Sequence, residues 1–333
     1  MPSLCPAGRP AVQLTARGEA CRIEPLSVTA LQLVTFFSLF AAGYLLRRSA
    51  RLPDQTGLVL SRLEVLLFLP ALCFNTMAKN FQAQVFRDQG PMILTGFLVV
   101  AVTYGAARLL AGRFTRDPIT RDVYVYSFTV PNLGYLGYPL VLALFGETTL
   151  FRYMVYAIPY QLFIYTVGIY ILNPARTFTF KSILNPSMAA LFAGIVVGLL
   201  RIPLPEVVTD TLNLAAQCMA PVAMLLTGFV LGAFTPGKLL SGLKSHIAAW
   251  IRLAVIPLAA LAVFRLAGAD PETTLLAVLL LAMPFGLNGV IFPQAHGKDS
   301  TEGAQICFVS HLYSLISLPL MIALLLAVLD WPG

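Results

Sequence analysis

Two short stretches, residues 131–139 and 283–293, combine asparagine with proline and glycine inside apolar sequence. The side-chain amides of Asn132 and Asn288 can donate to a carboxylate and carry no charge that would be costly in hydrocarbon. Proline lacks a backbone N–H and clashes with the preceding turn, so a helix breaks in each stretch and restarts with unpaired N–H groups. Such helix starts favour anions. The stretches predict an anion site; alternatively, both amides only satisfy the broken backbone.

The candidate ligand-binding residues are those that form or flank the two breaks. They are Pro131, Asn132, Gly134, Tyr135 and Gly137 in the first stretch, and Pro284, Gly286, Asn288 and Gly289 in the second. Tyr138 and Gln161 are further candidates for the cavity wall, although tyrosine is also common in the interfacial belt. No spacing of Cys and His fits a metal site, and no cofactor is expected.

Two ionisable side chains, Glu64 and His311, fall inside apolar segments. A carboxylate at membrane depth is costly and often functional, so Glu64 is a candidate proton carrier. The alternative is a structural pair with Arg62 or with a neighbouring helix. His311 can titrate near neutral pH and is a second coupling candidate, with simple packing as the alternative. We therefore expect H+ ahead of Na+ as a coupling ion.

The segments that must position these residues are strongly apolar. The chain of 333 residues is 58% hydrophobic and 11% charged, with a mean hydropathy of +0.81. Soluble domains carry about 25% charged residues, so this composition predicts an integral protein of the lipid bilayer. The net charge of +7 is spread over short clusters between apolar runs, which argues against a nucleic-acid partner.

From residue 26 onward, apolar runs of roughly 18–25 residues alternate with short polar joints, and each run is long enough to cross a bilayer. We predict ten membrane-spanning helices, at 26–46, 57–78, 91–111, 121–145, 149–172, 183–201, 206–232, 244–267, 272–295 and 303–329. Residues 1–25 have neither a helical period nor a signal-peptide pattern, so we expect a disordered tail.

The two halves of the chain resemble each other. Pro70 and Pro221 hold matching places in the second and seventh predicted spans, and similar intervals separate them from Pro131 and Pro284. Five spans per half would invert the second half in the membrane. We predict an all-α membrane protein of two inverted five-helix repeats, residues 26–172 and 183–329, joined by a cytoplasmic segment at 173–182. Paired interrupted spans are typical of a transporter site.

Basic residues indicate the orientation. With the N-terminus outside, fourteen of the 22 Lys and Arg residues fall at inner joints, five at outer joints and three in the tail. The fourteen are Arg47, Arg48, Arg51, Arg62, Arg108, Arg113, Arg116, Arg121, Arg176, Lys181, Lys238, Lys244, Arg252 and Lys298. This bias predicts a multi-pass protein of the cell (inner or plasma) membrane with both termini outside. Arg252 and Arg265 are expected to reach the surface by snorkelling.

Six stretches resemble the auxin efflux carrier family, which includes bacterial malonate and malate permeases and the plant PIN auxin exporters. They are residues 60–74, 130–146, 185–194, 220–228, 282–292 and 314–320. The resemblance covers about residues 26–328. It implies that the broken fourth and ninth spans cross at their unwound points. Spans 1, 2, 6 and 7 would form a scaffold, and the others a moving transport domain.

The resemblance implies a secondary transporter, or permease, of small organic anions such as malonate, malate or auxin-like carboxylates, with elevator-type alternating access. One departure is Gln294-Ala295-His296, where many members carry an acid and a lysine. The alternatives are a sodium-coupled organic anion symporter of the bile-acid type and a non-transporting receptor on the same fold. A homodimer is one candidate assembly.

An enzyme is not expected. The predicted spans contain no GxSxG motif and no pair of intramembrane aspartates, as an intramembrane hydrolase would require. The chain also lacks a GxxxxGK[ST] motif, so ATP is not the expected energy source.

Overall fold

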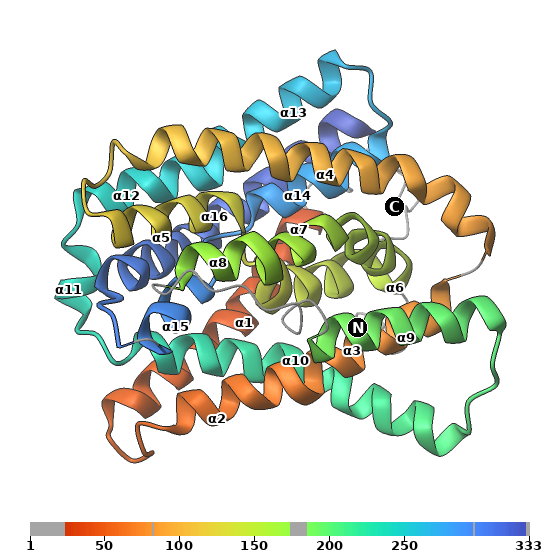
Figure 1. The fold of residues 1–333 in the computed structure, drawn as a ribbon, viewed down its shortest axis with the longest axis horizontal. Helices are drawn as coiled ribbons and strands as arrows, with labels where there is room; N and C mark the ends of the chain where they lie inside the picture. The colour runs from red at the N-terminus through yellow and green to blue at the C-terminus, as the bar shows by residue number, and fades with distance from the viewer. Residues whose placement is uncertain (1–23, 82, 174–184, 296, 331–333) are drawn as a thin grey trace, which may run out of the picture.

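The computed structural model describes residues 24–81, 83–173, 185–295 and 297–330 (Figure 1). The predicted tail at 1–25 and the predicted joint at 173–182 lie almost entirely outside these ranges. Within them every regular element is helical, and the one β-type contact is an isolated antiparallel bridge between Pro131 and Phe285. The all-α prediction is confirmed.

The helices are labelled in chain order in Figure 1. They are α1 (Glu24–Arg48), α2 (Thr56–Leu63), α3 (Leu69–Asn80), α4 (Ala83–Ala111), α5 (Pro118–Thr129), α6 (Tyr138–Tyr156), α7 (Ile158–Phe163), α8 (Ile169–Leu172), α9 (Pro186–Leu200), α10 (Glu206–Leu231), α11 (Pro236–Leu240), α12 (Leu243–Trp250), α13 (Ile256–Leu266), α14 (Pro271–Ala282), α15 (Asn288–Ala295) and α16 (Thr301–Leu329). Single π-helical turns join some of them: η2 (Glu64–Phe68), η3 (Leu133–Gly137), η4 (Ile164–Gly168) and η6 (Ile251–Val255).

Within the described residues, 6 helical segments are long and apolar enough to cross a membrane. They are Ser27–Arg48, Thr56–Asn80, Gln89–Ala111, Glu206–Leu231, Leu243–Leu266 and Thr301–Leu329. A pair of helices bent by 46°, Leu133–Tyr156 and Ile158–Leu172, would be a seventh span. The six single segments coincide with predicted spans, whereas the bent pair covers the second half of the predicted fourth span and all of the predicted fifth. The chain is therefore a multi-pass membrane protein.

The other predicted spans are shorter helices. α9 has 15 residues, and α14 has 12 because it ends at the second proline break. The first proline break likewise ends α5 after 12 residues. The chain between the predicted fourth and fifth spans turns at Gly146, whose φ of 82° and ψ of −179° belong to a region that is essentially restricted to glycine.

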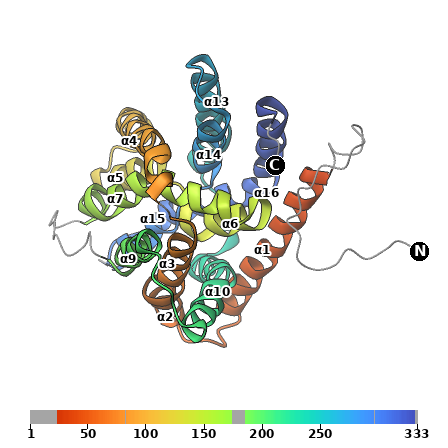
Figure 2. The ribbon, with the colours of Figure 1, turned by 90° about the vertical axis from the view of Figure 1, so that its right-hand side faces the viewer.

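The helices fall into two groups, which Figure 2 separates. In the first group α1 packs against α10, and α3 packs against α9 and α10. Glycines permit this close approach: a Cβ at Gly228 of α10 would collide with the Phe40 carbonyl of α1, and one at Gly194 of α9 would lie 2.5 Å from the Phe74 carbonyl of α3. In the second group α4 packs against α5, α6 and α7, α14 against α13 and α6, and α12 against α16. The turn η2 packs against α10 and belongs to the first group, whereas η3 leads into α6 and belongs to the second.

Candidate functional site

The two proline breaks lie against each other. At the C-terminal ends of α5 and α14, Val130 and Met283 adopt extended backbone, with ψ of 110° and 146°. The Asn132 backbone N–H then donates to the Pro284 carbonyl over 2.8 Å, beside the bridge between Pro131 and Phe285. The two predicted breaks therefore meet, and the point where they meet is called the crossing below.

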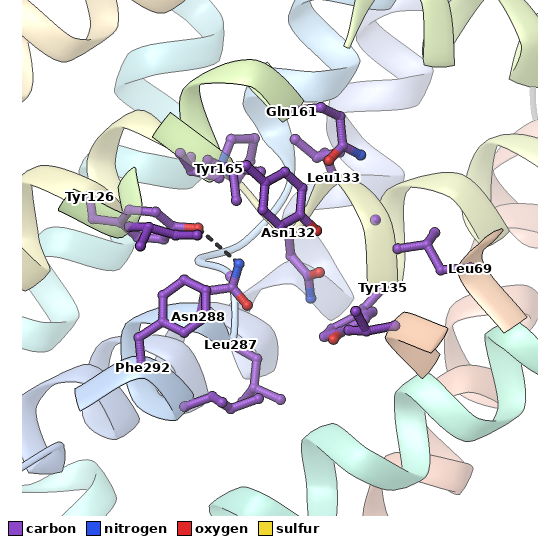
Figure 3. Close-up of a pocket in the computed structure, with 18 of the residues that line it drawn as sticks. Leu69, Tyr126, Asn132, Leu133, Tyr135, Gln161, Tyr165, Leu287, Asn288 and Phe292 are labelled. Atoms are coloured by element: carbon purple, nitrogen blue, oxygen red, sulfur yellow. Dashed lines mark hydrogen bonds between the residues drawn. The ribbon is translucent and has the colours of Figure 1, made fainter. Parts of the chain in front are cut away.

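A cavity of about 200 Å³ opens beside this crossing (Figure 3). Of the residues predicted from the sequence, those in its wall are Pro131, Asn132, Gly134, Tyr135, Gln161, Gly286 and Asn288. Figure 3 shows the side chains of Asn132 and Asn288 directed toward the same space. Cavities for drug-sized ligands measure about 300–1,000 Å³, so this one suits a smaller molecule.

Four predicted residues support the wall without lining the cavity. The Pro284 carbonyl accepts the bond from Asn132, and Tyr138 accepts one from Gln161 Nε2 over 2.8 Å. The two glycines permit close packing: a Cβ at Gly137 would lie 2.6 Å from the Tyr153 hydroxyl, and one at Gly289 would lie 2.9 Å from Ser127 Oγ.

Sequence reasoning missed three aromatic residues of the wall. Tyr126 on α5, Tyr165 on η4 and Phe292 on α15 line the cavity. Tyrosines in the fourth and fifth spans were ambiguous because the interfacial belt uses the same residue type. These rings give the cavity an apolar surface with hydroxyl groups at its edge.

The asparagine of the first break is held by a histidine from the end of the chain. Asn132 Nδ2 donates to His311 Nε2 over 3.0 Å, and His311 Nδ1 lies 2.7 Å from the Cys307 carbonyl. Because a carbonyl only accepts, the proton is on Nδ1 and Nε2 is the acceptor. Both side chains are buried. Asn132 keeps one N–H and its carbonyl oxygen for other partners.

The asparagine of the second break is held by a tyrosine that precedes the first break. Asn288 Nδ2 donates to the Tyr126 hydroxyl over 2.9 Å, as the dashed line in Figure 3 marks. Each asparagine is therefore oriented by a side chain from the other half of the chain. Because an amide carries two N–H groups, Asn288 also keeps one donor.

Two helix starts meet the cavity. η3, which leads into α6, contributes Gly134 and Tyr135 to the wall, and α15 contributes Asn288 as its first residue. The first N–H groups of a helix have no intrahelical partner and carry the positive end of its dipole. No Lys, Arg, Asp or Glu among the described residues lines the cavity, so the hydrogen-bond donors of its wall are neutral.

Glu64 lies behind the cavity wall on η2. Its side chain is fully buried, and within the described ranges neither carboxylate oxygen has a hydrogen-bond partner. The alternative of a pair with Arg62 is therefore not observed. Tyr135 on η3 is a titratable neighbour of Glu64 across the boundary between the two helix groups.

Arg252 lies at the crossing, and the prediction that it snorkels to the surface was wrong. Its side chain is fully buried in η6. The guanidinium bonds two backbone carbonyls, of Met283 and Phe128, each over 3.0 Å. These internal partners replace water at Nε and Nη1, whereas Nη2 has no hydrogen-bond partner among the described residues. Arg265 agrees with the prediction, since its side chain donates to Val328 at an exposed position.

Comparison with known proteins gives consistent results. A family model described as "Membrane transport protein" matches residues 28–179 and 175–322. A "Putative malonate transporter" of Rhizobium meliloti (strain 1021) is 26% identical over 313 residues, covering 85% of this chain and 91% of the relative. The "Uncharacterized transporter YfdV" of Escherichia coli (strain K12) is 22% identical over 304 residues, covering 87% of this chain and 95% of the relative. An "Uncharacterized transporter" of Methanothermobacter thermautotrophicus is 21% identical over 294 residues, covering 85% of this chain and 93% of the relative.

Proposed function

The chain belongs to the membrane transport protein family, that of the auxin efflux carriers, and on this premise we propose that it is a secondary transporter of small organic anions. One observation carries the proposal: two helix starts and two braced asparagines converge on one small cavity at the crossing of two broken helices. The printed name of the Rhizobium meliloti relative contains malonate, which supports a small carboxylate such as malonate, malate or an auxin-like acid.

In this proposal the carboxylate accepts hydrogen bonds from the free amide N–H groups of Asn132 and Asn288 and from the helix starts at the cavity. The carbon skeleton packs against Tyr126 and Phe292. Because the donors are neutral, the empty site carries no isolated charge through the membrane, where such a charge would be costly.

Alternating access would come from movement of the second helix group past the first. A second cavity of about 400 Å³ lies next to Arg47 and Asp54, at the predicted cytoplasmic end of the first two spans. It shares Ser61 and Ile291 with the cavity at the crossing, which supports an access route from the cytoplasmic side. Toward the opposite end, Lys79 Nζ on α3 lies 3.4 Å from Glu147 Oε1 on α6 and so joins the two groups. With the predicted orientation, this arrangement corresponds to an inward-facing state.

Glu64 is our first candidate for proton coupling. It belongs to the first helix group and its neighbour Tyr135 to the second, so elevator movement would change its surroundings and its tendency to hold a proton. His311 is the second candidate. Since both of its ring nitrogens are engaged, binding a second proton would release Asn132.

We further propose that the helices form ten spans in two inverted five-helix repeats, in the cell membrane with both termini outside. The bias of the basic residues supports this orientation. Labelling of single cysteines placed near residues 27 and 329 in intact cells tests it, because both should react with an impermeant thiol reagent.

A thermal-shift panel of mono- and dicarboxylates, followed by proteoliposome uptake of each carboxylate that binds, tests the function. We expect at least one small carboxylate to bind and to be transported without Na+. Uptake that requires Na+ would favour the symporter of the bile-acid type. Binding without uptake would favour a receptor and would contradict the proposal.

A further inference from the structure

Arg252 bonds the ends of two helices that belong to different halves of the chain. Nε donates to Met283, the residue that caps α14, and Nη1 donates to Phe128 in the last turn of α5. The final carbonyls of a helix have no intrahelical donor and carry the negative end of its dipole. A cation is the partner that both ends favour, and one side chain serves both.

Within the described part of the chain, the charge of Arg252 has no acidic counterpart. Among residues whose burial the structure describes, it is the only Lys or Arg with a buried side chain, and none of the ion pairs found there includes it. Its titratable neighbours are Tyr153 and Tyr160, which are neutral phenols. An uncompensated buried charge is costly. The two helix ends therefore supply the compensation, and packing alone does not explain an arginine at this position.

These contacts lie close in sequence to the candidate ligand-binding residues. Phe128 precedes Asn132 by four residues along the first break, and Met283 precedes Asn288 by five along the second. Arg252 itself does not line the cavity. A displacement of either helix end would therefore change the separation of the two asparagines, although the guanidinium touches neither of them.

We propose that Arg252 is a positioning residue for transport. Its guanidinium joins the C-terminal ends of α5 and α14, so that both breaks, and the cavity beside them, keep one geometry. The rigid, planar guanidinium directs donors toward two carbonyls at once, whereas the ammonium of lysine is a point charge on a flexible stem. The proposal predicts that the planar shape of the Arg252 guanidinium, as well as its charge, is needed to hold the two breaks in place.

The test compares Arg252→Gln and Arg252→Lys with Arg265→Gln, a control in the same predicted span whose arginine makes one exposed bond. The first readout is amide hydrogen exchange in purified full-length protein, over residues 128–136 and 283–291. Exchange reports local opening. In Arg252→Gln we expect both segments to exchange about tenfold faster, the equivalent of a tenfold shift in the opening equilibrium. In Arg252→Lys we expect at least one segment to exchange faster, and in Arg265→Gln neither.

The second readout, which rests on the proposed function, is uptake of labelled malonate in proteoliposomes. We expect KM to rise about tenfold in Arg252→Gln and to recover only partly in Arg252→Lys, because lysine restores charge without the second bond. Faster exchange with an unchanged KM would reduce Arg252 to a structural contact and overturn the proposal. Wild-type exchange rates in both segments of Arg252→Gln would also overturn the proposal.

If Arg252→Gln does not accumulate, Arg252→Lys tests the proposal instead, with the same two readouts of hydrogen exchange and KM. If the wild-type protein does not take up malonate, that result counts against malonate as the substrate. The hydrogen-exchange measurement then still tests Arg252 separately.

Discussion

Asn132 and His311 are 179 residues apart in sequence, yet their side chains are joined by a buried hydrogen bond of 3.0 Å. The bond fixes the histidine as the tautomer that carries its proton on Nδ1, and it leaves one N–H of the asparagine for a ligand. The first break is thus tied to α16, the last helix of the described chain. Substitutions at these two positions are predicted to be coupled.

A double-mutant cycle measures that coupling. Asn132→Ala and His311→Leu should each raise the KM for uptake about tenfold, and the double variant should be little worse than either alone. The interaction free energy expected for residues in contact is about 0.5–3 kcal/mol. Strictly additive effects would show that His311 does not orient Asn132. Gln217→Ala, which removes an exposed amide from α10, serves as a control and should leave KM unchanged.

Glu64→Gln tests the proton role of the buried carboxylate. Glutamine keeps the size of the side chain, but its amide does not titrate and so cannot take up and release a coupling proton. We expect uptake by this variant to lose most of its dependence on pH between pH 5 and 8 while the protein still binds substrate. Glu206→Gln, at an exposed position of α10, is the control. A pH profile that matches the wild type would exclude Glu64 from coupling.

Crosslinking tests the proposed movement of the two helix groups. Lys79 and Glu147 are replaced by cysteine in a variant without the native cysteines, and a short bifunctional thiol reagent then joins α3 to α6. An exposed ion pair of this kind contributes only about 0–1 kcal/mol, so the substitutions alone should leave uptake nearly unchanged. The crosslink should abolish uptake, and reduction of a cleavable linker should restore it. Full uptake by the crosslinked protein would argue against movement at this boundary.

Gly228→Ala tests the packing of α1 against α10. The added Cβ would collide with the Phe40 carbonyl, and overpacking of this kind typically costs about 1–3 kcal/mol. We expect a lower thermal unfolding temperature in detergent. Gly105→Ala on α4 is the matched control, because a Cβ there meets no atom within 4 Å. It should be neutral or slightly stabilising, since alanine favours a helix over glycine.

Much of the fold could be predicted because its signals are local. Apolar runs of spanning length located the helices, and Pro131 and Pro284 located the breaks, since a missing backbone donor acts within one helical turn. The same prolines explain why α5 and α14 are too short to pass as uninterrupted spans. Gly146 ends the predicted fourth span by a backbone conformation that few other residues adopt.

The tertiary contacts of the candidate site carry no such local signal. Nothing near Asn132 in the sequence indicates a bond to His311, and nothing near Asn288 indicates Tyr126. Arg252 was misinterpreted because a basic residue in the first half of a predicted span, here 244–267, resembles a topogenic charge that reaches the surface. Only its three-dimensional position, beside the ends of two helices from different halves, shows that the charge is used internally.

Counterflow in proteoliposomes tests most directly whether the crossing is a transport site. The liposomes are loaded with an excess of the unlabelled carboxylate that gives the largest thermal shift, and the labelled compound is added outside. The wild-type protein should accumulate label transiently above protein-free liposomes, and a variant that combines Asn132→Ala with Asn288→Ala should not. Binding without exchange by the wild type, or undiminished counterflow by the double variant, would contradict the proposal.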